Sequence, residues 1–190
     1  MKNDKIQTIE NELLVMAAQN GNAKAMDELV NRWQKRLWSH AYRLTASQQG
    51  SWDITQESWM AIIKNLKKLN DTSAFKSWIY KITTNKAINW IKKTQKERKC
   101  TQLDQNQPEN SSNNTDIGLE ELIQKLDFKK RIVLNLCYFE DMSISAISKI
   151  LKIPEGTVKS RLSKARSELK NYWTIKEQNH GKQRLTKNIK

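Results

Sequence analysis

The residues best suited to binding chemistry lie late in the sequence, in a segment that reads PEGTVKSRLSKAR over positions 154–166. Apolar residues recur there every three or four positions, as on one face of a helix: Val158, Leu162, Ala165 and Leu169. The opposite face carries cationic, hydroxyl and carboxylate groups, which can neutralise phosphates or hydrogen-bond to base edges. This polar face predicts contacts with duplex DNA, and its residues are Glu155, Thr157, Lys159, Ser160, Arg161 and Lys164.

The surrounding residues predict a helix-turn-helix. Ser143 is a candidate N-cap for a short helix over residues 144–151, and the next helix is expected to begin around Pro154, whose fixed φ suits a first turn. The interval leaves room only for a tight turn, in which Lys152 stands where many such motifs have glycine. Two short helices across such a turn, the second more basic, favour DNA binding over an ordinary solvated helix face.

No set of side chains converges on catalysis or on a metal ion. Cys100 and Cys137 lie far apart without a CxxC pair, and His40 and His180 stand alone. Acidic residues near position 53 are too sparse for a metal-dependent enzyme that acts on nucleic acid. The sequence therefore predicts no catalytic residue, no metal and no cofactor.

Composition restricts the fold to helices. The chain has 190 residues, of which only five are glycine and two proline, too few for the turns of a β-sandwich or the glycines of a phosphate loop. Hydrophobic residues make up 37% and include seven tryptophans, so a chain disordered throughout is excluded. No apolar run is long enough to span a bilayer, and the first residues lack a signal-peptide core. We expect an all-α cytoplasmic protein without membrane insertion.

The net charge of +14 is unevenly distributed along the chain. Residues 1–100 carry +9, residues 101–128 carry −5 and residues 129–190 carry +10. The middle block contains QLDQNQPENSSNNTD at positions 102–116, which cannot bury enough apolar surface to order itself. This segment is interpreted as a linker between two domains, with a long surface loop inside one domain as the alternative.

Helical periodicity occupies both basic blocks. In the first block, a helix over residues 54–69 is expected to place Ile63 on its apolar side, and a helix over residues 74–93 is expected to break near Thr83 and Thr84. We expect two small helical domains joined by a flexible linker, the second with the helix-turn-helix. The predicted segments are domain 1–98, linker 99–118, domain 119–173 and basic tail 174–190.

Several runs carry a family resemblance. Residues 143–169, SISAISKILKIPEGTVKSRLSKARSEL, resemble the promoter-binding C-terminal domain of bacterial sigma factors. Three earlier runs are similar to the N-terminal sigma domain: AQNGNAKAMDELVNRW, DITQESWMAI at 53–62 and FKSWIYKITTNKAINWIKK at 75–93. The domain order, the length and the polar linker resemble those of the small extracytoplasmic-function group.

The resemblance implies roles for particular residues. Asp53, Gln56 and Glu57 would lie on the helix that docks against the largest subunit of RNA polymerase. The segment 69–90 resembles the part that opens and holds the promoter's minus-ten element, and Trp90 would be either core or a stacking surface. The C-terminal helix would read the minus-thirty-five element as duplex. The candidates for minus-ten contacts are Lys76, Lys81, Asn85, Lys86, Asn89, Trp90 and Lys93.

The function implied by this resemblance is a sigma factor. Such a protein binds core RNA polymerase, directs it to promoter DNA and helps melt the minus-ten region without covalent chemistry of its own, and family members are commonly held by an anti-sigma factor. The acidic linker would either occupy the polymerase's RNA path or act only as a tether. The alternative function is a conventional helix-turn-helix transcription regulator whose N-terminal domain senses a signal or dimerises; only a sigma factor needs core polymerase.

Overall fold

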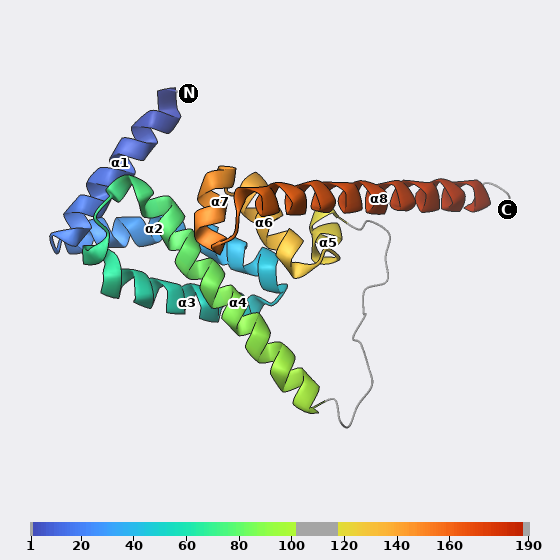
Figure 1. Ribbon diagram of the computed structural model, residues 1–190, viewed down its shortest axis with the longest axis horizontal. Helices are drawn as coiled ribbons and strands as arrows, with labels where there is room; N and C mark the ends of the chain where they lie inside the picture. Colours follow the sequence, from blue (N-terminus) through green and yellow to red (C-terminus); the bar gives the residue numbers. More distant parts are fainter. Residues whose placement is uncertain (1, 102–117, 188–190) are drawn as a thin grey trace. The chain divides into compact units, whose positions relative to one another are not determined.

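The computed structural model describes residues 2–101 and 118–187, and every regular element in these ranges is a helix (Figure 1). Contacts between residues divide the chain into two compact units, with the division between residues 108 and 109. That division falls inside the predicted linker, of which residues 102–117 lie outside the described ranges. For the described residues, the prediction of an all-α fold with two helical domains is confirmed.

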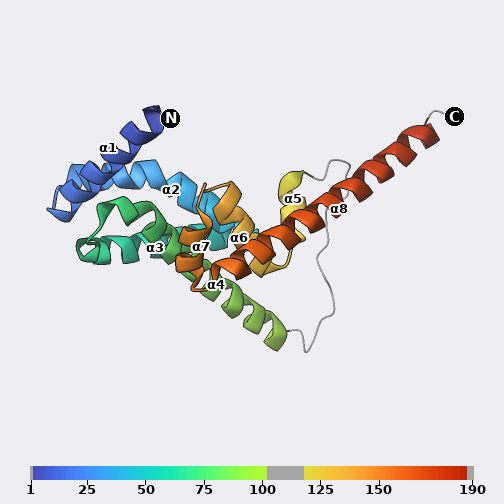
Figure 2. The same cartoon turned by 45° about the horizontal axis from the view of Figure 1, so that its top comes forward.

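The first unit is a bundle built around its second helix. α2 packs against α1, α3 and α4, and α3 also packs against α4 (Figure 2). Its core includes Leu29, Leu37, Ile62, Ile79 and Tyr80, all completely buried. The elements are α1 (Lys2–Gln19), α2 (Ala23–Thr45), α3 (Gln48–Asn65), two short 3₁₀ turns η1 (Leu66–Lys68) and η2 (Thr72–Ala74), and α4 (Phe75–Thr101).

Side-chain caps fix where these helices begin. Asn22 precedes α2, and its side-chain oxygen accepts a hydrogen bond from the Ala25 amide at 3.1 Å. Ser47 precedes α3 and accepts from the Gly50 amide at 3.0 Å. Each cap satisfies one of the amide groups that a helix leaves without an internal partner at its start. The Ser47 cap thus fixes where α3 begins, and α3 carries the predicted docking residues.

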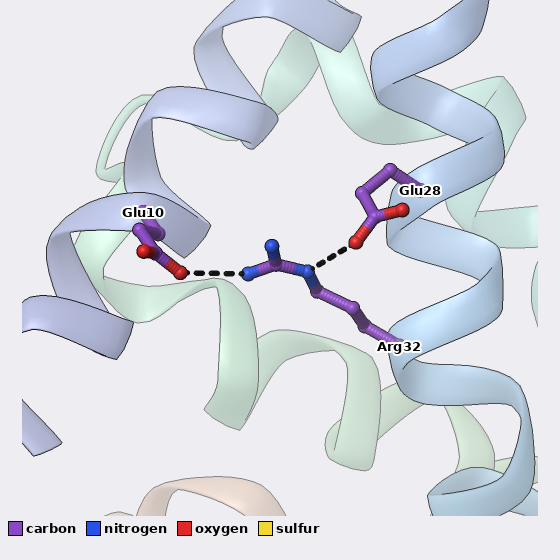
Figure 3. Close-up of polar contacts among 3 residues, drawn as sticks. All are labelled: Glu10, Glu28 and Arg32. Carbon is purple, nitrogen blue, oxygen red and sulfur yellow. Dashed lines mark hydrogen bonds and ion pairs between the residues drawn. The ribbon is translucent and has the colours of Figure 1, made fainter. Parts of the chain in front are cut away.

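Arg32 on α2 forms a polar contact with α1. Its Nε donates to Glu28 Oε1, one turn earlier, at 2.7 Å, and its Nη1 donates to Glu10 Oε2 of α1 at 3.3 Å (Figure 3). The hydrogen bond to Glu28, followed by that to Glu10, raises the pKa of Arg32. All three side chains are partly exposed, so water screens the charges and the contact orients α1 more than it stabilises the fold.

The expected break near Thr83 and Thr84 is wrong, because α4 continues through both residues. Both side chains are fully buried, and their hydroxyls find partners within α4 and on α2. Thr83 Oγ1 donates to the Ile79 carbonyl at 3.0 Å, and Thr84 Oγ1 lies 2.9 Å from His40 Nε2. A threonine pair that would weaken an isolated helix is therefore stabilised by the helix against which it packs.

His40 makes the stability of the first unit sensitive to acid. Its buried ring packs edge-on against Tyr80 at 5.1 Å between centroids. Burial, followed by the charge of Arg43, lowers the pKa of His40 from 6.5 to about 3. Below pH 6.5 the unfolded chain binds a proton that the folded chain does not, so we expect folding to lose up to about 1.4 kcal/mol per pH unit from this group.

A His40→Gln variant tests that expectation while keeping a polar group beside Thr84. Urea unfolding of both proteins between pH 4 and 7 isolates the histidine contribution, because the carboxylates are common to both. The wild type should lose stability faster than the variant as the pH falls. Equal pH slopes would contradict the assignment of a buried neutral imidazole.

The second unit packs three short helices around the start of a long one. α8 packs against α5, α6 and α7, and its core includes Leu136, Ile147, Val158 and Ala165. The elements are α5 (Leu119–Gln124), α6 (Phe128–Tyr138), α7 (Ile144–Leu151) and α8 (Glu155–Lys187). Figures 1 and 2 show α8 continuing as one helix well past α6 and α7. The boundary predicted at residue 173 therefore lies within a helix.

α7, the tight turn and the start of α8 form the predicted helix-turn-helix. Ser143 caps α7 as expected, accepting a hydrogen bond from the Ala146 amide at 3.1 Å. Lys152 takes the left-handed conformation that glycine would adopt most easily, with φ 54° and ψ 47°. Its amide bonds to the Ser148 carbonyl, and Ser148 Oγ donates to the Ile153 carbonyl at 2.6 Å. These hydrogen bonds stabilise the turn, so that Lys152 keeps the left-handed conformation usually taken by glycine.

Replacing Lys152 with glycine should stabilise the protein by about 1 kcal/mol, because a side chain in the left-handed region is strained and glycine is not. Urea unfolding measures this change directly. Lys149→Gly is the matched control: the same residue type is exchanged within α7, where glycine should destabilise by about 1 kcal/mol. A loss of stability in both variants would mean that the turn carries no strain.

Candidate nucleic-acid interface

The start of α8 presents the polar face that the sequence predicts. Val158, Leu162 and Ala165 are buried against the rest of the second unit. Opposite them, Glu155, Lys159, Ser160 and Lys164 are exposed, while Thr157 and Arg161 lie partly buried on its flank. All six predicted DNA contacts thus occupy the first three turns of one helix. Ser160 Oγ donates to the Thr157 carbonyl at 3.0 Å, which leaves its oxygen free to accept further hydrogen bonds.

The exposed face of α8 extends beyond the predicted residues. Ser163, Arg166 and Lys170 follow Lys159 at intervals of four, three and four, so they lie along the same side of the helix. All four side chains are exposed. The spacing of these residues in the sequence already places them on one face, but the predicted set of DNA contacts on this helix ends at Lys164. The added cations lengthen the basic surface along the helix axis.

In the first unit, two sets of predicted residues line one groove. Asp53, Gln56 and Glu57 of α3 face α4 across a cavity of about 470 Å³. The α4 side of this groove carries the predicted DNA contacts Lys86, Asn89, Trp90 and Lys93.

An ion pair crosses this groove. Lys86 Nζ donates to Glu57 Oε2 at 2.8 Å, with side chains 37% and 59% exposed. Farther along α4, Lys93 lies 3.9 Å from Glu97. The sequence predicts the α3 and α4 sets as separate sites, and it does not predict this contact between them.

The remaining predicted residues of α4 lie elsewhere on the helix. Lys76 stands near its start, about 15 Å along the axis from Lys86. Lys81 and Asn85 lie on the side of α4 opposite the core, with Asn89 one turn further on. Two exposed lysines that were not predicted, Lys92 and Lys96, continue this ridge, and Asn85, Asn89, Lys92 and Lys96 are all exposed.

Trp90 packs against Gly50, and its ring is partly buried. A Cβ added at Gly50 would lie less than 3.0 Å from three atoms of the ring. Gly50 is therefore required for the close approach of α3 and α4. Trp90 therefore packs against α3, and its ring also lines the groove. Its role as a stacking surface for DNA bases stays a prediction.

The exposed side of α3 also carries apolar residues. Trp52, Met60 and Ile63 are 51%, 67% and 52% exposed, beside the exposed Gln56. The expectation that Ile63 faces the core is wrong, because the neighbouring Ile62 takes that position and is fully buried. The Trp52 ring lies 5.8 Å from Trp38, and both line a second groove of about 380 Å³. Exposed apolar residues gathered in this way are typical of protein–protein contacts.

Two further observations concern the described residues only. In residues 2–101 and 118–187, no three histidine, cysteine or acidic side chains lie close enough together to hold a metal ion. None of the helices in those ranges is both long and apolar enough to cross a membrane.

Taken together, a basic helix-turn-helix in one unit and a helical bundle in the other define a two-domain helical DNA-binding protein. Comparison with known families supports this class. Residues 29–97 match the family model for Sigma-70 region 2, and residues 117–169 match that for Sigma-70 region 4.

Curated sigma factors match this chain in sequence over most of its length. The sigma factor SigW of Bacillus subtilis, an ECF RNA polymerase sigma factor, is 26% identical and covers 82% of this chain and 92% of its own length. The ECF RNA polymerase sigma-E factor of Escherichia coli K12 is also 26% identical, over 87% of this chain and 95% of its own.

Solved structures share the fold. CnrH, in complex with the cytosolic domain of CnrY, superposes with a TM-score of 0.66 at 21% identity, over 87% of this chain and 97% of its own. The sigma factor RpoE from Bartonella quintana, in complex with the anti-sigma factor NepR, superposes with a TM-score of 0.68 at 18% identity. The match covers 80% of this chain and 99% of RpoE.

The chain belongs to the sigma-70 family, in its extracytoplasmic-function group. The match of the first unit to region 2 decides against a regulator with a separate sensing domain.

Proposed function

We propose that this sigma factor binds core RNA polymerase through α3, holds the melted minus-ten element along α4 and reads the minus-thirty-five element as duplex with α8. The observation that carries the proposal is the presence, in one chain, of a basic helix-turn-helix face and of an α3 surface rich in exposed apolar residues. A protein that only bound DNA would have no need of the second surface.

For the minus-thirty-five element, we assign the exposed face of α8. Lys159, Arg161 and Lys164 supply positive charge, and Glu155, Thr157 and Ser160 supply hydrogen-bonding groups for base edges or backbone. Arg166 and Lys170 are exposed on the same helix and extend the phosphate-binding surface. The remainder of the helix-turn-helix positions this face, as a recognition helix requires.

For the minus-ten element, we assign the polar side of α4. Single-stranded DNA is held by cations that follow its backbone and by aromatic or amide groups that meet its bases. Asn85, Asn89, Lys92 and Lys96 form an exposed ridge that suits such a strand. The predicted Lys76, Lys81, Lys86, Trp90 and Lys93 lie on either side of the ridge or before it on α4.

For docking on polymerase, we assign the exposed side of α3. Asp53, Gln56 and Glu57 supply the polar and acidic groups of this surface. Trp52, Met60 and Ile63 extend it with apolar area, which is where the energy of a protein interface is usually concentrated. The acidic groups repel DNA, so the α3 surface is suited to a protein partner.

The remaining parts of the proposal follow from the family. The protein makes no covalent change in DNA, and binding energy alone stabilises the melted promoter. It acts in the cytoplasm with polymerase, and an anti-sigma factor regulates it. The related sigma factor RpoE has been solved in complex with the anti-sigma factor NepR. The acidic linker would follow the polymerase's RNA path or tether the two units.

Run-off transcription tests the proposal. Purified core polymerase is combined with the protein and a library of promoter fragments, and core binding is measured separately by fluorescence anisotropy of the labelled protein. We expect specific start sites that require the protein. The absence of both start sites and core binding would overturn the proposed function.

A further inference from the structure

The last residue of α1 is hydrogen-bonded to the loop between α3 and α4. Gln19 Nε2 donates to the Leu66 carbonyl at 2.9 Å and to the Leu69 carbonyl at 2.7 Å. Leu66 begins the 3₁₀ turn η1, and Leu69 directly follows its last residue. The side-chain amide of glutamine has two protons to donate, and here both are bound to one short turn. The partners are 47 and 50 positions from Gln19 in the sequence, so these bonds depend on how α1 packs.

The α3–α4 loop, which we define as residues 66–74, has an anchor on either side of these bonds. At its start, the Leu66 side chain is buried in the core. Near its end, Asp71 caps η2, because its Oδ1 accepts hydrogen bonds from the Ser73 amide at 3.0 Å and from Ser73 Oγ at 2.6 Å. Gln19 holds the Leu69 carbonyl between these two anchors. α1 also packs against both η1 and η2, so it supports the loop along most of its length.

The polar side chains of the α3–α4 loop suit a nucleic-acid strand. Lys67, Lys68 and Asn70 are all exposed. The loop leads directly into α4, where Lys76 stands near the start of the helix and belongs to the predicted minus-ten contacts. Cations that follow a phosphate backbone and polar groups beside its bases are typical of surfaces that bind single strands. The sequence-based set of DNA contacts begins at Lys76 and omits these three residues.

We infer that Gln19 is a positioning residue for the melted minus-ten strand. It touches no DNA, and it keeps the α3–α4 loop in the conformation from which Lys67, Lys68 and Asn70 meet the strand. Without Gln19, the backbone of the loop would have to be ordered when the strand binds, and the lost conformational entropy would weaken binding. The inference rests on the proposed function, and it adds a residue of α1 to the machinery that holds the open promoter.

The two hydrogen bonds set the size of the expected effect. Each bond between an amide and a carbonyl makes a modest net contribution, so losing both should weaken strand binding about five- to tenfold. Binding of duplex DNA through α8 should be unchanged, because α8 belongs to the other unit. Core binding should also be unchanged, since the docking surface on α3 does not include the loop.

The first test uses holoenzyme and a promoter fragment in which mismatches keep the minus-ten region melted. Gln19→Ala should bind this fragment about five- to tenfold more weakly than the wild type, as measured by fluorescence anisotropy. Asn65→Ala is the matched control. Asn65 Nδ2 donates to the Ala61 carbonyl at 2.9 Å, so this variant also removes an amide side chain bonded to a backbone carbonyl beside η1, but the bond lies within α3. Wild-type affinity of Gln19→Ala, or an equal loss in both variants, would overturn the inference.

The second test asks whether Gln19 acts through the loop. In a background of Lys67→Ala, Lys68→Ala and Asn70→Ala, the Gln19→Ala change should cause no further loss of affinity for the melted fragment. A double-mutant cycle reports this dependence, since residues that act independently give additive losses. Full additivity would contradict a positioning role.

Gln19→Glu provides a second variant of nearly the same shape. Its carboxylate has no proton to donate at neutral pH and would face the two carbonyl oxygens of Leu66 and Leu69. It should therefore bind the melted fragment at least as weakly as Gln19→Ala. Wild-type affinity of Gln19→Glu would show that the donated hydrogen bonds have no part in strand binding, which would overturn the inference.

The inference and the proposed function fail in different ways. If the wild-type holoenzyme binds the melted fragment and starts transcription, but Gln19→Ala equals it, only the role of Gln19 is wrong. If the wild type neither binds core polymerase nor supports start sites, the proposed function is wrong and the inference falls with it. A loss of core binding in Gln19→Ala as large as its loss of strand binding would indicate general damage to the first unit, and it would also overturn the positioning role.

Discussion

A holoenzyme that carries Lys159→Ala, Arg161→Ala and Lys164→Ala together is expected to bind promoter duplex about a hundredfold more weakly than the wild type. Lys159 and Lys164 are exposed on the side of α8 that faces away from the core, and Arg161 lies partly buried on its flank. If each neutralises one phosphate, the slope of log K against log salt should shrink by about 2.7 units, because each phosphate contact contributes about 0.9. Affinity measured over a range of potassium chloride concentrations reports both quantities.

A charge-matched control separates this effect from the general attraction between a basic protein and DNA. Lys24→Ala, Lys125→Ala and Lys129→Ala also remove three positive charges, from exposed positions that we assign to no DNA contact. Their effect on affinity and salt slope should be small. Arg161 can be distinguished further, because the loss of a base contact relaxes sequence preference and the loss of a phosphate contact does not. Equal losses in the two triple variants would remove α8 from the interface.

Local spacing was sufficient to predict the α8 face. Val158, Leu162 and Ala165 repeat at helical intervals, and a helix must turn such a stripe toward the core. Four of the six predicted groups on the other side are then exposed, and Thr157 and Arg161 lie partly buried on its flank. The Ser143 cap and the turn before Pro154 depend equally on neighbours in the sequence, which is why both were predictable.

Contacts between helices could not be predicted in this way. Glu57 and Lys86 are 29 residues apart, and Gly50 meets Trp90 from 40 positions away. Nothing in the spacing on either helix specifies which residues face one another across α3 and α4. The docking and DNA-binding residues were therefore predicted as two lists, although the fold places several of them in one groove.

Two errors at α3 and α4 have the same origin. Ile62 and Ile63 are adjacent and equally apolar, so periodicity alone did not decide which one is buried. The threonine pair in α4 was expected to break the helix on its intrinsic preference, but His40 lies within hydrogen-bonding distance of Thr84 and the bundle surrounds both. In both cases the packing of a neighbouring helix decides the outcome, and that neighbour is distant in the sequence.

The exposed apolar residues of α3 lead to a second prediction with a large expected effect, which concerns affinity for core polymerase. Trp52→Ala combined with Met60→Ala should weaken binding to core polymerase at least tenfold, because aromatic residues at the centre of an interface carry much of its energy. Both side chains are more than half exposed in the structure, so their loss should cost the fold little. Core binding by anisotropy and run-off transcription should fall together.

Trp173→Ala is the matched control for this variant, since Trp173 is 45% exposed on α8 and lies outside the docking surface. Its core affinity should stay near that of the wild type, which would show that the loss depends on where the tryptophan lies. The α3 variant should keep its binding to duplex DNA through α8, because the two surfaces belong to different units. If core binding survives the loss of both Trp52 and Met60, the apolar side of α3 is not the docking surface, and the acidic and amide groups of that helix would have to account for docking alone.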